Sequence, residues 1–204
     1  GTGLGRARLL DAPAKPTALS GLVEVNLSGC AALPTLRFEG LQSLACVTFS
    51  GCAALHTVSL QGLPSLREVR DLASCSSLTK LTMEGLDSLT SLDLTGCIAL
   101  SSLGIHRLDS LASLCLARCL GLRALAMEAL PALSSVVDVT SCTVLEQLVL
   151  QGCPSARVRG LTTCKDSLQR LAIDRLARDI HISSEELAGC TDLRALTLGE
   201  ASPE

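Results

Sequence analysis

The cysteines are the residues of this chain whose type and number most suggest chemistry. There are eleven of them, and thiols can bind a metal ion, pair as disulfides, or fill a core as small apolar groups in a reducing compartment. Seven recur at intervals of 22 or 23 residues: Cys30, Cys52, Cys75, Cys97, Cys119, Cys142 and Cys164. A zinc site commonly uses two closely spaced cysteine pairs, and only Cys115 and Cys119 are that close here. The interval therefore predicts a structural repeat with buried, reduced thiols and no metal site.

Nucleophilic catalysis is the other chemistry that cysteine and histidine could support. Cys46 and Cys115 occupy positions expected to face solvent, but a nucleophilic thiol needs a base within hydrogen-bond reach. The histidines, His56, His106 and His181, belong to other positions of the repeat. The glycines lack the lysine and the following helix of a phosphate-binding loop. We therefore expect no enzyme activity, no cofactor and no small-molecule substrate.

Charge and composition narrow the class of partner. Lys and Arg number 17 against 20 Asp and Glu, which gives a net charge of −3, and aromatic residues make up 1% of the chain. Nucleic-acid binding relies on a basic surface and on aromatic platforms for bases, so we expect no nucleic-acid partner. No apolar run approaches the roughly 18–20 residues of a membrane-spanning helix. Because reduced thiols indicate the cytosol, we expect a cytoplasmic protein that does not enter a membrane.

The elements that position these side chains follow from a shorter repeat. Around the cysteines the pattern is apolar-x-apolar-x-Gly-Cys-x-x-Leu, as in residues 92–100, and between them it is apolar-x-apolar-x-Gly-Leu-x-x-Leu, as in residues 81–89. Alternating apolar residues are typical of a short strand with one buried face, and glycine permits a sharp corner. Since stacked coils can pair such strands in parallel around a common core, we predict a solenoid of about eight coils, with strands on both long sides and few helical turns.

The repeat covers most of the chain as a single domain. Residues 18–204 are the predicted solenoid, and we expect its last coil to be incomplete in the given sequence. Residues 1–17 do not fit the repeat and are expected to be a cap or a linker.

Three irregularities of spacing predict local features. The two 23-residue intervals contain an extra residue within residues 69–72 and 136–139, which predicts a β-bulge at each place. The interval before Cys190 is longer, and Ser183 and Glu186 within it have the spacing of a capping box. That spacing predicts a single helical turn.

The nested pattern Leu-x-x-Leu-x-Leu-x-Gly-Cys-x-x-Leu-x-x-Leu-x-Leu-x-Gly-Leu resembles a leucine-rich repeat of the short, irregular class, over roughly residues 18–198. The cysteines stand where that family has its asparagine ladder. They are similar to the cysteine-containing repeats attached to F-box proteins, although those repeats are longer, about 26 residues, and no F-box-like segment is present here. The resemblance implies a solenoid of the α/β horseshoe class, here mostly β, with a surface for binding other proteins.

One row of outward-facing positions is the candidate binding face. The residues that follow the second apolar anchor of successive Gly-Leu strands are Glu39, Gln61, Glu84, His106, Glu128, Gln151 and Asp174. Acids alternate with other residues, so like charges stand two coils apart, at about 10 Å. The row predicts a partner with a basic surface, although acids on a strand can equally be soluble filler. The other strand face is small and nearly neutral: Asn26, Thr48, Arg70, Asp93, Cys115 and Asp138.

We therefore expect a non-catalytic protein–protein interaction module that presents its strand faces to an intracellular partner. A structural spacer or scaffold in a cytoskeletal or multiprotein assembly is the alternative from a different class. An enzyme inhibitor and a ubiquitin-ligase substrate receptor are further alternatives, which rest on analogy with other leucine-repeat proteins.

Overall fold

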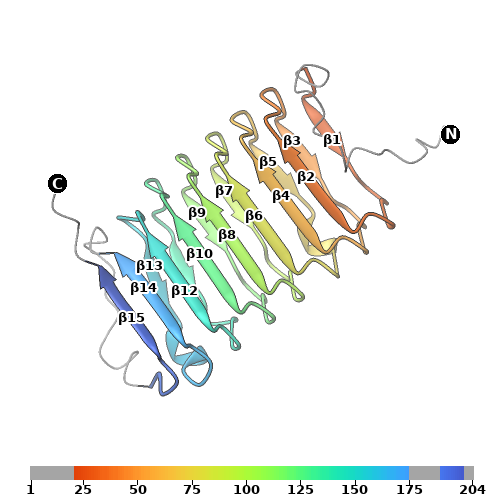
Figure 1. Cartoon of the computed structure of the whole chain (residues 1–204). Helices are drawn as coiled ribbons and strands as arrows, with labels where there is room; N and C mark the ends of the chain where they lie inside the picture. The colour runs from red at the N-terminus through yellow and green to blue at the C-terminus, as the bar shows by residue number, and fades with distance from the viewer. Residues whose placement is uncertain (1–20, 175–188, 200–204) are drawn as a thin grey trace.

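The chain folds into a parallel β-solenoid, in which successive turns of about 22 residues each add a strand to two long sides (Figure 1). The computed structural model describes residues 21–174 and 189–199. Within these ranges the helical segments are two 3-10 helices, η2 (Leu72–Ser74) and η3 (Leu161–Cys164). No helix in the described ranges has the length and apolar character needed to span a membrane. The predicted solenoid, with strands on both long sides and little helix, is confirmed.

One long side is an eight-stranded parallel sheet, the wide sheet. Its strands in chain order are β2 (Thr35–Glu39), β4 (Thr57–Gln61), β6 (Lys80–Glu84), β8 (Ser102–His106), β10 (Ala124–Glu128), β12 (Gln147–Gln151), β14 (Arg170–Asp174) and β15 (Ala195–Gly199). Strands pair without a shift in register, so that Leu36 is opposite Val58 and Val58 is opposite Leu81. Residues at the same place in the repeat therefore form straight rows across the wide sheet.

The other long side carries three-residue strands, which form three shorter sheets. The strands are β1 (Glu24–Asn26), β3 (Cys46–Thr48), β5 (Glu68–Arg70), β7 (Ser91–Asp93), β9 (Ser113–Cys115), β11 (Val136–Asp138) and β13 (Arg157–Arg159). The first three pair with one another, β7 pairs with β9, and β11 pairs with β13. We call this side the narrow side.

The narrow side is interrupted where an interval contains an extra residue. In the first interval Asp71 adopts a left-handed φ of 61° and η2 follows it, so a 3-10 helix accommodates the residue in place of the bulge predicted at residues 69–72. In the second interval the extra residue is Ser135, whose hydroxyl accepts a hydrogen bond from the amide of Leu114 at 3.3 Å. It precedes β11, which pairs regularly with β13. The bulge predicted at residues 136–139 is therefore also wrong.

Two sequence predictions concern other parts of the chain. The helical turn predicted at Ser183 and Glu186 and the cap or linker predicted at residues 1–17 both lie outside the described residues.

The interior of the stack is apolar throughout the described coils. Strands of the wide sheet direct two side chains inward, such as Leu81 and Met83 of β6, both 0% exposed. Burial of each such side chain contributes about 1.5–3 kcal/mol. Among the described residues no polar or charged side chain is buried, so ionisable carboxylates, guanidinium groups and imidazoles in this part of the chain all lie at the surface.

The repeating cysteines line one inner corner of the stack. From Cys52 to Cys164 they are at most 3% exposed, which confirms their predicted inward direction. The thiol of Cys119 donates a hydrogen bond to the carbonyl of Leu94 in the preceding coil at 3.2 Å. A thiol is a weak donor, so it can contact the corner carbonyl without bringing a strongly hydrated group into the core. Cys115 is exposed and Cys46 is half-buried.

The corners that follow the wide-sheet strands require a left-handed backbone. Gly40, Gly62 and Gly85 have φ values of 69°, 58° and 62°, which glycine adopts without steric cost. The next two coils place Arg107 and Ala129 at the same corner, both with a φ of 53°. An L-residue in this conformation costs roughly 1–2 kcal/mol, so these two corners are strained.

Candidate functional site

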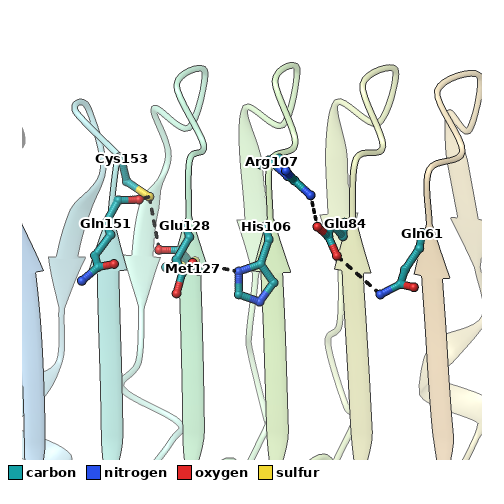
Figure 2. Close-up of polar contacts among 8 residues, drawn as sticks. All are labelled: Gln61, Glu84, His106, Arg107, Met127, Glu128, Gln151 and Cys153. Atoms are coloured by element: carbon teal, nitrogen blue, oxygen red, sulfur yellow. Dashed lines mark hydrogen bonds and ion pairs between the residues drawn. The ribbon is translucent and has the colours of Figure 1, made fainter.

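The residues predicted to form a binding face end successive strands of the wide sheet (Figure 2). We call them the polar row: Glu39, Gln61, Glu84, His106, Glu128, Gln151 and Asp174. The sheet register places each of the first five directly opposite the next, from Glu39 to Gln151. Asp174 ends β14, and its side chain lies outside the described part of the structure.

The acids of the polar row are bridged by neighbouring donors. Arg37 donates to Glu39 at 2.7 Å and to Gln61 at 3.1 Å. Gln61 in turn donates to one oxygen of Glu84 at 3.4 Å, and Arg107 forms an ion pair with the other oxygen (Figure 2). These contacts link β2, β4, β6 and the corner after β8. The negative charge expected from the sequence is therefore partly compensated within the chain.

A second contact continues the row toward β10. His106 Nδ1 lies 3.3 Å from Glu128 Oε2 (Figure 2). The imidazole also covers the glycine of its own strand, because a Cβ at Gly104 would stand 3.1 Å from His106 Nε2. The ring thus lies over the outer face of β8 and is 29% exposed.

An open groove lies beside the polar row at the corners after β2, β4, β6, β8 and β10. Its polar lining is Glu39, Gln42, Gln61, Glu84, Asp87, Arg107 and Asp109, and the corner residues Gly40, Gly62, Gly85 and Ala129 complete it. Four carboxylates therefore face one guanidinium. We call this feature the acidic groove.

The charged groups of the acidic groove are accessible. The Glu39 side chain is 63% exposed, that of Arg107 is 70% exposed, and that of Glu84 is 33% exposed. Ion pairs between exposed side chains contribute only about 0–1 kcal/mol to stability. Breaking one of these pairs to bind an incoming cation therefore costs little, so the row can exchange its internal contacts for external ones.

Several residues that line the groove, and Arg37 beside it, were not identified from the sequence. Arg37 precedes Glu39 by two residues on the same face of β2. Asp87 and Asp109 lie past the corner, where no strand alternation indicates which way a side chain points. Arg107 had a detectable signal, because it replaces the corner glycine found at Gly40, Gly62 and Gly85. This departure from the repeat could have identified Arg107 as a candidate site residue.

Three of the six residues in the outward column on the narrow side, the other candidate face, help to close corners. The side-chain oxygens of Asn26, Asp93 and Asp138 each accept the backbone N–H two residues further on, at 2.9, 2.9 and 3.0 Å. Asp138 also pairs with Arg159. Hydrogen bonds from that guanidinium and from Thr140 lower the pKa of Asp138 to about 2. Half of this column is therefore occupied in stabilising turns.

The buried thiols are poorly suited to nucleophilic chemistry. Burial raises the pKa of Cys97 and Cys164 to about 11 and that of Cys119 and Cys142 to about 12, whereas the thiolate is the reactive species. In the described ranges no three His, Cys, Asp or Glu side chains gather in a way that could hold a metal ion. The geometry instead offers a fixed array of exposed charges.

Comparisons with known proteins give no relative from which a role could be transferred. No family model, no curated protein and no solved structure matches the chain. The interpretation of the acidic groove therefore rests on its own geometry and charge.

Proposed function

We propose that the protein is a non-catalytic interaction module, a short-repeat solenoid of leucine-rich type, that binds a basic segment of a partner protein along its polar row. The observation that supports this proposal is the acidic groove, in which four carboxylates face a single guanidinium at the edge of a continuous sheet. Electrostatic complementarity of this kind raises association rates and selects partners more than it raises affinity.

The spacing of the acids suggests the form of the partner. Glu39 and Glu84 belong to β2 and β6, two strands apart, which corresponds to about 10 Å. An extended peptide rises about 3.3 Å per residue, so basic side chains at every third position match this interval. A segment lying across the strands, along the row, would bring successive arginines to successive acids. Bidentate arginine–carboxylate pairs would add geometric selectivity.

A defined pair of peptides tests this function. One is a repeat of Arg-Ser-Gly, and the other, with Glu in place of Arg, is the charge-reversed control. The protein should bind the arginine peptide at low ionic strength and not the glutamate peptide, with an association rate that falls as salt screens the groove. The proposal is contradicted if both peptides bind equally well or if neither binds.

A matched pair of variants tests whether the groove itself binds the arginine peptide. Glu39→Gln/Glu84→Gln removes two groove charges with little change in shape, and Asp166→Asn/Asp192→Asn removes two exposed acids from the last described coils. The groove variant should lose most of the binding, whereas the control variant should retain it. Equal weakening in both would mean that total charge alone attracts the peptide.

The thiols support an intracellular setting for this module. The cysteines from Cys30 to Cys142, including Cys46 and Cys115, carry free thiols, and free thiols persist in reducing compartments. We propose the cytoplasm as the place where the module works.

A further inference from the structure

Arg107 departs from the repeat at a corner that otherwise suits glycine. The equivalent corners after β2, β4, β6 and β12 are glycines with positive φ: Gly40, Gly62, Gly85 and Gly152. The φ of Arg107 is 53°, in the region where an L-residue is strained. The Arg107 amide donates to the Glu128 carbonyl at 2.9 Å, just as the Gly85 amide donates to the His106 carbonyl at 3.1 Å. The backbone of this corner therefore makes its contact without any need for the arginine side chain.

The Arg107 side chain lies in the acidic groove. It is the one guanidinium among the groove residues, and it forms an ion pair with Glu84 of the preceding coil (Figure 2). Ala129 has the same left-handed corner one coil later, also with a φ of 53°, but it carries no charge. The fold thus tolerates a strained corner with or without a guanidinium. What distinguishes Arg107 from Ala129 is its contact with Glu84.

Both carboxylate oxygens of Glu84 are occupied within the chain. Gln61 donates to one oxygen at 3.4 Å, and Arg107 pairs with the other. Two other acids of the groove, Asp87 and Asp109, form no ion pair in the part of the chain that the structure describes. An arginine that arrives at Glu84 from outside therefore meets a group of its own chemistry already in place.

We propose that Arg107 is an internal competitor of the partner's arginine, an inference that rests on the proposed function of the acidic groove. Before binding, the Arg107 guanidinium holds the place on Glu84 that a guanidinium of the partner takes. On binding, Arg107 is released into solvent. Its side chain is already 70% exposed, so the release requires no movement of the core and leaves no charge buried without a partner.

An internal competitor makes the groove selective for partners with several arginines. A group tethered close to its binding site acts at an effective concentration of roughly millimolar order, so a single arginine at lower concentration rarely displaces Arg107. A segment with several arginines contacts Glu39 as well as Glu84, and the additional contact offsets the loss of the internal ion pair. Arg107 therefore weakens the binding of isolated cations more than that of a multivalent arginine segment.

Two arginine-to-glycine variants test this role of Arg107. Arg107→Gly removes the competitor from Glu84. Arg118→Gly is the matched control, because Arg118 is also exposed, has a left-handed φ of 61° and lies outside the groove. Each variant loses one positive charge and one strained corner, so only the contact with Glu84 separates them. The Arg-Ser-Gly peptide should bind Arg107→Gly up to about fivefold more tightly than the parent, which is the strength of an exposed ion pair, and should bind Arg118→Gly as it binds the parent.

Side-chain NMR of the parent follows the displacement itself. Without peptide, the guanidinium of Arg107 should rotate about its Cζ–Nε bond more slowly than that of Arg118, and this difference should disappear as the peptide binds. Unchanged affinity in Arg107→Gly, an equal gain in both variants, or an Arg107 signal that the bound peptide leaves unaltered would overturn the inference and leave the proposed function standing. If the peptide binds neither the parent nor the variants, the proposed function fails and this inference fails with it.

Discussion

At the scale of single residues, the cysteine thiol combines two properties that the inner corner needs. It is small and apolar enough to be almost fully buried, and it still donates to a carbonyl of the preceding coil, as Cys52 does to Leu27 at 3.2 Å. A hydroxyl would donate more strongly but would cost more to remove from water. The same burial makes the thiol a group whose ionisation opposes folding.

Alkaline pH should therefore unfold the protein. Burial raises the pKa of Cys119 and Cys142 to about 12, while an unfolded thiol titrates near 8.5. Between these values the unfolded chain releases protons that the native chain retains, so stability is fully present below about pH 8.5 and falls above it, by up to about 1.4 kcal/mol per pH unit for each such thiol. Urea unfolding between pH 7 and 10 measures this slope.

A cysteine variant tests that explanation directly. Cys119→Ala should be less stable than the parent at pH 7, because it leaves a small cavity, but its stability should decrease less steeply with pH. Cys115→Ser, which changes an exposed thiol, serves as the control and should follow the parent. Identical slopes for Cys119→Ala and the parent would contradict ionisation of the buried thiols as the cause.

The strained corner at Ala129 should also be measurable. Its φ of 53° costs an L-residue roughly 1–2 kcal/mol. Replacing Ala129 by glycine removes this strain, but the greater entropy of glycine in the unfolded chain offsets about 0.4–1 kcal/mol of the gain in stability. Ala129→Gly should therefore raise the free energy of unfolding by about 0.5 kcal/mol. Ala126→Gly in the middle of β10 should lower it by about 0.5–1 kcal/mol. Destabilisation by both substitutions would show that the corner is unstrained.

At the scale of elements, the contact between adjacent turns limits what each coil tolerates. A Cβ at Gly121 would stand 2.6 Å from the Ile98 carbonyl oxygen, whereas one at Gly21 would meet nothing within 4 Å. Because backbone, not a mobile side chain, blocks the first site, Gly121→Ala should cost about 1–3 kcal/mol. Gly21→Ala should be nearly neutral. Thermal unfolding compares the two, and equal melting temperatures would mean that the turns can separate freely.

The elements also show how far the sequence alone could lead. Alternating apolar residues and a fixed interval translate directly into parallel strands and aligned rows, so the strands and the alignment of Glu39 with Gln61 and Glu84 were predictable. Corners carry no such periodicity. The 3-10 helix after Asp71 and the placement of Arg107 against Glu84 depend on side-chain direction at a turn, which residue spacing does not encode.

At the scale of the whole molecule, the apolar interior and the charged rows are consequences of the same stacking. Each coil buries its leucines only by packing on its neighbours, as the stacked strands show (Figure 1). The same in-register stacking aligns the outward residues. A sheet held in this way presents charges at fixed spacing, so a ligand that matches the spacing need not order the surface on binding. We propose that this fixed polar row and its acidic groove form the binding surface.

Amide chemical-shift mapping tests that claim most directly. Isotope-labelled protein is titrated with the Arg-Ser-Gly peptide at low salt, and shifts are followed for every assigned residue. We predict that the largest changes lie at the ends of β2, β4 and β6 and at the glycines that follow them, Gly40, Gly62 and Gly85, and that they disappear in Glu39→Gln/Glu84→Gln. Shifts concentrated on the narrow side, around Asn26 and Asp138, or spread evenly over the surface would contradict the account.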